Sequence, residues 1–283
     1  MKWIKKNMTT ILLLLILLVG VSLLLYPTVS DYWNSLHQSQ AIAAYAEAVA
    51  EVNDERYEQM WDDAYDYNQQ LRKKTNRWVM TDEEREEYEA LLNVSGNGIL
   101  GYIEIPKIKV ALPIYHGTDE TILQIAVGHI EGSSLPVGGE GTHAVLSGHR
   151  GLPSAKLFTN LDELVVGDEF YIRVLDETLT YEVDQIRIVE PDDLSDLKIE
   201  EGKDLCTLVT CTPYGINTHR LLVRGHRVET KASANSIRVT ADAIQIDPEI
   251  VAPVVAIPIL LMLLVWLLWH SHRREKERRK RRG

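Results

Sequence analysis

The chain lacks the positive charge that a nucleic-acid-binding surface needs. Its 283 residues carry a formal net charge of −11, and residues 1–6 and 271–283 together hold eleven Lys or Arg against two Glu. The region between these ends therefore carries a net charge of −20. Because phosphate groups are bound by a basic face, this composition excludes a nucleic acid as the partner of the central region.

Cysteine is almost absent, and the two that occur are Cys206 and Cys211. They lie five residues apart on one expected strand, and an odd separation directs side chains to opposite faces of a strand. This spacing argues against a disulfide between them. We expect Cys206 to be a small buried apolar residue and Cys211 to be a free thiol, which in an exported protein is a candidate reactive group.

Charge is also missing from two long apolar runs, residues 7–30 and 250–269. Each run is long enough to cross a hydrocarbon core of about 30 Å as a helix, which takes about 20 residues. Since Lys and Arg beside a span stay in the cytoplasm, we expect two spans of the plasma membrane, with both termini inside and the region between them outside.

These runs set the expected domain organisation. Residues 1–30 are expected to form a cytoplasmic tail and a transmembrane anchor, with a cleaved signal peptide as the alternative because "TVS" precedes Asp31. A second transmembrane helix is expected over 250–270. The basic tail 271–283 is interpreted as a cytoplasmic topology signal, with contact to anionic lipid as a further role.

Helical and strand patterns divide the outer region. Residues 31–97 place apolar residues at helical spacing, and Thr81 followed by three acidic residues predicts the start of a helix. Residues 98–229 contain many short strands separated by Gly, Pro and Asp. This pattern indicates a mainly β fold, a closed or nearly closed barrel with short helices. Residues 230–249 are expected to be a polar linker.

Three side chains of the expected barrel are suited to acyl transfer. Cys211 ends one strand, Arg220 opens the next strand after a turn, and His149 lies in a loop. A cysteine reacts as its thiolate, an imidazole supplies and removes protons, and a guanidinium stabilises an oxyanion. The spacing alone leaves open a buried strand cysteine, a loop histidine without a role and a barrel ion pair.

A metal site is the other chemistry that the barrel residues suggest. Its ligands would be the histidines His143, His149, His219 and His226. The sequence has no HExxH motif and no paired cysteine spacing, so we expect neither a metal nor a cofactor.

The sequence resembles the sortases, the transpeptidases of Gram-positive cell surfaces. Residues 207–211, "TLVTC", match the TLxTC signature of that family. Further stretches are similar to the pilus-assembling class C in order and spacing, namely "GYIEIPKI", "VGHIEGSSLPVGGEGTH", "GTHAVLSGHRGLPSAKLFTNLDEL" and "TPYGINTHRLLVRGHR". The resemblance covers residues 98–229 and implies an eight-stranded sortase-type β-barrel. It also implies that Cys211 is the nucleophile, with His149 and Arg220 as its catalytic partners, and the two expected spans fit class C.

The resemblance implies a reaction as well. A class C sortase cleaves an LPxTG-like sorting signal between Thr and Gly through a thioester on its cysteine, and transfers the product to a lysine amine of a pilin. The alternatives are transfer to a cell-wall precursor amine and, as in a plain cysteine protease, transfer to water. A non-enzymatic surface protein that is itself a sortase substrate would need LPxTG before the second span, where "IQIDPEIVAP" lacks it.

One departure from class C concerns the lid. Many of those sortases cover the site with an Asp-Pro-aromatic motif ahead of the barrel, whereas the only Asp-Pro here is Asp247-Pro248, beyond the barrel. Trp78, in the helical segment 31–97, is a candidate substitute; the alternative is that it packs between two helices. The acidic residues of "GTDE" and "EPDD" are interpreted as solvated turns, although some sortases bind calcium.

Overall fold

The computed structural model describes residues 8–231. The described residues fall in two units, with the boundary between Thr28 and Val29. The expected second span, the basic tail, the first seven residues and all but the start of the expected linker lie outside the described residues.

The first described element is the helix α2, Met8–Ala50. Its apolar part has a mean hydropathy of 2.8 and is long enough to cross a membrane, as expected of either an anchor or a signal sequence near the N-terminus. The helix continues without interruption past residue 30, so the boundary that the sequence predicted there falls inside one element. Among the described residues it is the one helix with the length and composition of a span.

Eight strands form a closed barrel in the order β1-β2-β3-β4-β7-β8-β6-β5. The parallel pairs are β2 with β3 and β4 with β7, and the other neighbours are antiparallel. The barrel confirms the predicted fold. Its strands are β1 (Ile99–Ile105), β2 (Val110–His116), β3 (Val127–His129), β4 (Thr142–Ser147), β5 (Glu169–Val174), β6 (Glu177–Val189), β7 (Asp204–Thr212) and β8 (His219–Val228).

Side chains on β7 alternate between the barrel interior and its outer face, because successive residues of a strand point in opposite directions. Cys206 and Leu208 belong to the main core. Val209 packs instead in a second, smaller cluster with Leu222 of β8. Cys206 is fully buried, Cys211 is partly exposed and neither forms a disulfide, which confirms the prediction for both thiols.

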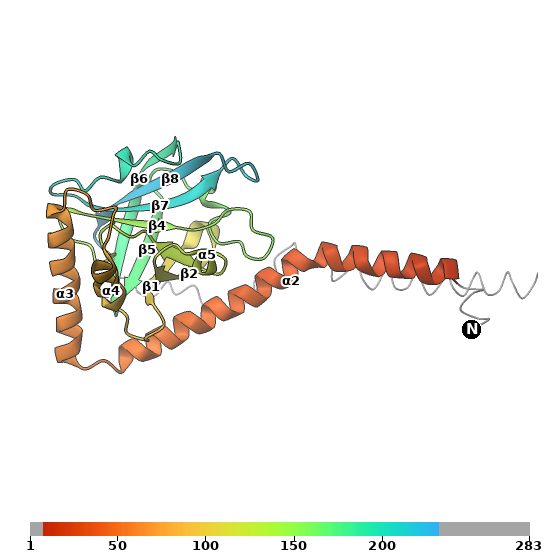
Figure 1. Cartoon of the computed structure of the whole chain (residues 1–283), viewed down its shortest axis with the longest axis horizontal. Coiled ribbons are helices and arrows are strands. Elements are labelled where there is room, and N and C mark those ends of the chain that lie inside the picture. Colours follow the sequence, from red (N-terminus) through yellow and green to blue (C-terminus); the bar gives the residue numbers. More distant parts are fainter. Residues whose placement is uncertain (1–7, 232–283) are drawn as a thin grey trace, which may run out of the picture. The chain divides into compact units, whose positions relative to one another are not determined.

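Helices cover one side of the barrel (Figure 1). The helix α3 is Asp54–Lys73, and α4, Asp82–Ala90, begins with the predicted cap, in which Thr81 and Glu84 bond each other's backbone N–H groups. The short elements are α5 (Glu120–Leu123) and the 3-10 helices η1 (Pro106–Ile108), η2 (Leu161–Glu163) and η3 (Ser195–Leu197). In α2, the hydroxyl of Tyr45 donates to the carbonyl of Leu100 at 3.1 Å and accepts from the N–H of Leu175 at 2.7 Å, so this helix is also fixed to the barrel.

Asn68 fixes α3 to the connection between β3 and β4. Its Nδ2 donates to the Leu135 carbonyl at 3.1 Å, and its Oδ1 accepts from the Leu135 N–H at 2.7 Å. Both residues are buried. The substitution Asn68→Ala leaves both backbone groups unpaired and is expected to lower the free energy of unfolding by about 1–3 kcal/mol. Thermal unfolding of the full chain in detergent measures this; a midpoint equal to that of the exposed control Gln70→Ala would contradict it.

Candidate active site

Cys211 and Arg220 face each other across two neighbouring strands. They are direct partners in the antiparallel pairing of β7 with β8. Side chains of such a pair lie on the same face, with Cβ atoms about 4.5–5.5 Å apart. Because Val209 and Leu222 form the next pair on that face, the thiol and the guanidinium lie on the outside of the barrel.

His149 reaches the same end of the barrel through β4, which runs parallel to β7. Just beyond β4, the N–H of Gly148 donates to the carbonyl of Val209 at 3.1 Å. The hydroxyl of Thr210 donates to the carbonyl of Gly148 at 2.7 Å. These two bonds join the residue before His149 to the two residues before Cys211. The structure therefore brings the three sequence-predicted side chains to one end of the barrel, and it gives Thr210 a role that the sequence did not reveal.

The loop that carries His149 is folded around Phe158. The N–H of Phe158 donates to the His149 carbonyl at 3.1 Å, and its ring is fully buried. A Cβ at Gly148 would lie 2.8 Å from the Phe158 ring, closer than side chains approach, so glycine is required for this contact. The loop is consequently fixed on both sides of the imidazole.

Arg150 connects this loop to the turn after β7 and was not singled out from the sequence. Its guanidinium pairs with Asp162, and its Nη1 donates to the Thr212 hydroxyl at 3.4 Å. It also lies 5.9 Å from the ring centroid of Tyr214, within cation–π range. Arg150 is therefore a structural link between the histidine loop and the strand that carries Cys211.

The guanidinium of Arg220 is available for a ligand. Its Nη1 donates to the carbonyls of His219 at 3.2 Å and Asn217 at 3.4 Å. Among the described residues, no carboxylate lies within ion-pair distance of Arg220. Arg224, on the same face, differs because its hydrogen bonds to Asp184, both 2.9 Å long, raise the pKa of its guanidinium. One arginine of this face is thus neutralised, and the one beside Cys211 is not.

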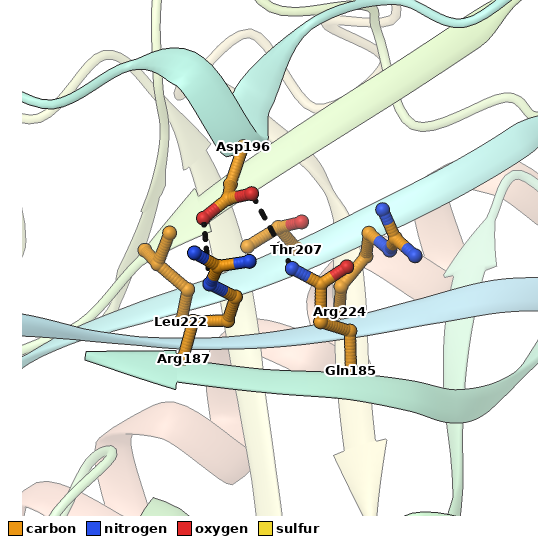
Figure 2. A pocket seen from close by; sticks show the side chains of 6 residues that line it. All are labelled: Gln185, Arg187, Asp196, Thr207, Leu222 and Arg224. Carbon is orange, nitrogen blue, oxygen red and sulfur yellow. Dashed lines mark hydrogen bonds and ion pairs between the residues drawn. The ribbon is translucent and has the colours of Figure 1, made fainter. Parts of the chain in front are cut away.

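The outer face continues from the thiol into a small pocket, shown in Figure 2. Thr207 and Arg224 are the cross-strand pair after Val209 and Leu222. Asp196 of η3 accepts from Gln185 at 3.3 Å and pairs with Arg187 at 3.3 Å. The pocket is lined by Gln185, Arg187, Asp196, Thr207, Leu222 and Arg224. Cys211 therefore lies at one end of a face that is apolar in its middle and polar beyond.

Trp78 packs beside the apolar middle of this face. It contacts a cluster to which the barrel strands contribute Val145, Val189, Val209 and Leu222, and η3 contributes Leu197. Arg77 fixes the segment, since its guanidinium donates to the carbonyls of Gly132 at 2.7 Å and Leu197 at 2.5 Å. Burial lowers the pKa of Arg77 to about 10, which leaves it charged at neutral pH.

The four histidines considered as metal ligands do not meet. His143 is buried, with Nδ1 at 2.7 Å from the Lys198 carbonyl and Nε2 at 2.7 Å from the Thr207 hydroxyl. His219 pairs with Thr212, and His226 with Leu205 at the far end of the same strand pair. Within residues 8–231, no group of three or more His, Cys, Asp or Glu side chains is placed to hold a metal ion.

A free thiol, an imidazole and an available guanidinium at one end of a closed eight-stranded barrel define a cysteine-dependent acyl-transfer enzyme. Residues 103–228 match the family described as the Sortase domain. The crystal structure of sortase C1 from Streptococcus agalactiae is 54% identical and covers 68% of this chain and 100% of its own, with a TM-score of 0.66. The chain belongs to the sortase family, whose members are cysteine transpeptidases.

Further relatives support the same family. A structure of Clostridium perfringens sortase C with the C-terminal cell wall sorting motif is 46% identical, covering 68% of this chain and 99% of its own at a TM-score of 0.60. Sortase D of Bacillus subtilis (strain 168) is 37% identical over 131 residues, which is 45% of this chain. The match spans 63% of the length of that curated relative. Both of these solved structures are sortases C, which confirms the resemblance to class C.

Two buried histidines make stability depend on pH. His129 bonds the Tyr88 hydroxyl and the Ser134 carbonyl, each at 2.8 Å. Burial lowers the pKa of His129 and of His143 from 6.5 to about 4. The unfolded chain therefore binds more protons than the folded chain below pH 6.5, so stability is full above that pH and falls as the pH drops toward 4.

This pH dependence is measurable as the midpoint of thermal unfolding of the full chain, followed by tryptophan fluorescence in detergent. We expect the midpoint to fall steadily from pH 7 to pH 5, because protons bind the unfolded histidines. The variant His143→Gln retains an amide that can bond its neighbours but does not titrate, so its slope should be shallower. An unchanged slope in this variant would rule out His143 as a source of the effect.

Proposed function

We propose that this chain is a membrane-anchored class C sortase that cleaves an LPxTG-like sorting signal between Thr and Gly and joins the threonyl group to a lysine amine of a pilin, so that pili are polymerised. The observation that carries the proposal is the pairing of Cys211 with Arg220 beside the loop of His149. The two membrane spans, the cytoplasmic termini and the extracellular barrel belong to this proposal, supported by the apolar α2 and the basic ends of the chain.

The proposed reaction consists of two successive acyl transfers, in which each site residue has its own role. In the first, the Cys211 thiolate attacks the threonyl carbonyl, Arg220 stabilises the oxyanion, and His149 donates a proton to the departing glycine amine. A thioester remains on Cys211. In the second, the lysine amine attacks the thioester, gives its proton to His149 and releases the thiolate. The product is an isopeptide, and the enzyme returns to its starting protonation state.

The substrate class is supported by the relatives and by the face beside the thiol. The Clostridium perfringens sortase C structure includes a C-terminal cell wall sorting motif, and a Streptococcus pneumoniae sortase C structure is described as informative on pilin substrate specificity. In this chain, Val209 and Leu222 offer an apolar surface next to Cys211, suited to the leucine and proline of the signal.

The acceptor has two further candidates. An amine of a cell-wall precursor would make the enzyme an anchoring sortase, and water would make it a plain protease. A non-enzymatic surface protein is disfavoured, because such a protein needs no aligned Cys, His and Arg at the end of a barrel.

The proposal predicts the outcome of incubating the full chain in detergent with an LPxTG-type peptide and a lysine peptide. Cys211→Ala should form no thioester, and His149→Ala should lose roughly 10²–10⁴-fold in kcat. Arg220→Lys, which lacks the planar fork, should lose about 10- to 1000-fold. The thiol control Cys206→Ala should retain turnover, because Cys206 faces the core.

Mass spectrometry of the products separates the three acceptors. A lysine isopeptide supports polymerisation, a crossbridge adduct supports anchoring, and hydrolysis that is independent of any amine supports a protease. If neither the wild type nor Trp78→Ala cleaves the peptide or forms a thioester at Cys211, the proposed function is wrong.

The segment around Trp78 is proposed to be the lid of this sortase. Trp78 packs against the apolar cluster that includes Val209 and Leu222, the residues proposed to contact the sorting signal, and Arg77 beside it bonds two backbone carbonyls. The backbone of this segment also lies close to Gly132. A Cβ at that position would be 2.2 Å from the Arg77 carbonyl oxygen, so a residue larger than glycine would push the segment away. The same segment would have to move before a peptide reaches Val209 and Leu222.

Removing the ring tests the lid. Trp78→Ala should lower the KM for the peptide about threefold to thirtyfold, because the ring no longer competes for the apolar face. Val79→Ala, which changes an exposed neighbour, is the matched control. An unchanged or raised KM in Trp78→Ala would show that Trp78 only packs on the barrel.

A further inference from the structure

A carboxylate that does not belong to the three predicted site residues faces the imidazole of His149. It belongs to Glu120, the first residue of α5, whose Oε2 lies 3.8 Å from Nε2 of His149. Nε2 is buried and, among the described residues, has no hydrogen-bond partner. Leaving a buried ring nitrogen without a hydrogen bond costs free energy of folding. The Glu120 carboxylate is therefore a candidate partner for this nitrogen.

The Glu120 side chain is oriented by Gln124, the residue just after α5. Its other oxygen, Oε1, accepts from Nε2 of Gln124 at 2.5 Å. This bond occupies one carboxylate oxygen and leaves Oε2 directed toward His149. The neighbouring Asp119 makes no side-chain bond to the helix and does not reach the imidazole. The contact is therefore specific to one of two adjacent acidic residues.

The segments that carry Glu120 and His149 are both held by α2. Just beyond α5, the Ile125 carbonyl accepts from Nε2 of Gln38 at 2.7 Å. On the histidine loop, the Ser154 carbonyl accepts from Nδ2 of Asn34 at 2.7 Å. The N–H of Lys156, in the same loop, donates to Oδ1 of Asp31 at 2.8 Å. One helix thus holds the two segments that carry the carboxylate and the imidazole.

We propose that Glu120 is a positioning residue for His149: its carboxylate accepts a hydrogen bond from the Nε2–H group, fixes the ring plane and leaves Nδ1 to exchange protons with the reacting groups. This inference rests on the proposed function, since it assigns His149 the proton transfers of that reaction. The proton on Nε2 stays in place throughout, while Nδ1 gives a proton to the leaving amine and later takes one from the attacking lysine.

The observed separation suits this role. A distance of 3.8 Å exceeds a hydrogen bond of about 2.7–3.2 Å, but catalytic contacts without substrate are often long and tighten in the complex. Glu120 is 71% exposed and His149 28% exposed, so a rotation of the glutamate side chain closes the gap without moving the histidine loop. Exposure also limits the effect to a modest one, because solvent screens the pair.

Kinetics of the full chain in detergent test the assignment. Glu120→Ala should lower kcat for an LPxTG-type peptide about threefold to tenfold and leave KM within twofold, because orientation of the base is lost while binding is not. Glu120→Gln retains an oxygen acceptor and should recover part of the loss. The matched control Asp119→Ala removes the adjacent charge and should keep the wild-type kcat and KM.

Histidine NMR tests the contact without any substrate. In the full chain labelled with ¹⁵N-histidine, at a pH high enough to leave the imidazole neutral, the His149 signals, assigned by their loss in His149→Ala, should report a protonated Nε2 and an unprotonated Nδ1. Glu120→Ala should shift these signals toward a mixture of the two tautomers, and Asp119→Ala should not.

The outcomes are distinguishable from failure of the proposed function. If the wild type does not cleave the peptide, the proposed function is wrong, and the NMR comparison still decides whether Glu120 orients the ring. If Glu120→Ala matches Asp119→Ala in both kcat and the His149 signals, the positioning role is overturned. A rise in KM with unchanged kcat also overturns it, because that pattern places Glu120 in peptide binding.

Discussion

The site depends above all on the position of β7 between β4 and β8. On one side, β7 pairs in parallel with β4, and on the other it pairs in antiparallel fashion with β8. The first pairing ends where the histidine loop begins, and the second places Arg220 opposite Cys211. A shift of one residue in either register would turn the thiol into the barrel core or separate it from its partners. Backbone hydrogen bonds, rather than contacts among the three side chains, therefore fix the arrangement.

The alternation of side chains along β7 gives the two cysteines opposite environments. Cys206 lies in the core, where burial raises the pKa of its thiol and leaves it unreactive. Cys211, on the outer face, is partly exposed and is the cross-strand partner of Arg220. The same rule distinguishes neighbouring residues of β8, since Leu221 and Val223 fill the core while Arg220 and Leu222 face outward.

Much of this was predictable because it is local. Strand alternation, turn residues and the capping box at Thr81 are encoded within short stretches, and the structure confirms eight strands and the cap. The candidate site residues Cys211, His149 and Arg220 were predicted from a short motif and its neighbours, and the structure brings them to one end of the barrel. Glu120 was not, because "GTDE" has the composition of a solvated turn and its contact with His149 depends on a loop folded elsewhere.

Other features escaped the sequence for the same reason. Trp78 packs against strands that lie far from it in the chain. The sequence of its own segment therefore could not decide whether Trp78 packs between two helices or forms part of a lid. The role of Thr210 depends on the parallel pairing with β4, which connects residues more than sixty positions apart. The boundary expected at residue 30 was based on a change from apolar to polar composition. The structure shows one helix, α2, that continues across this position.

The continuity of α2 means that the catalytic unit is larger than the barrel. A shortened protein that began after residue 38 would retain all eight strands, the thiol, the imidazole and the guanidinium, but would lack the hydrogen bonds from Asp31, Asn34 and Gln38. In such a fragment, the segments that carry Glu120 and His149 would lose the bonds that hold them to α2. The part of α2 between residues 31 and 38 therefore belongs with the barrel as one structural unit.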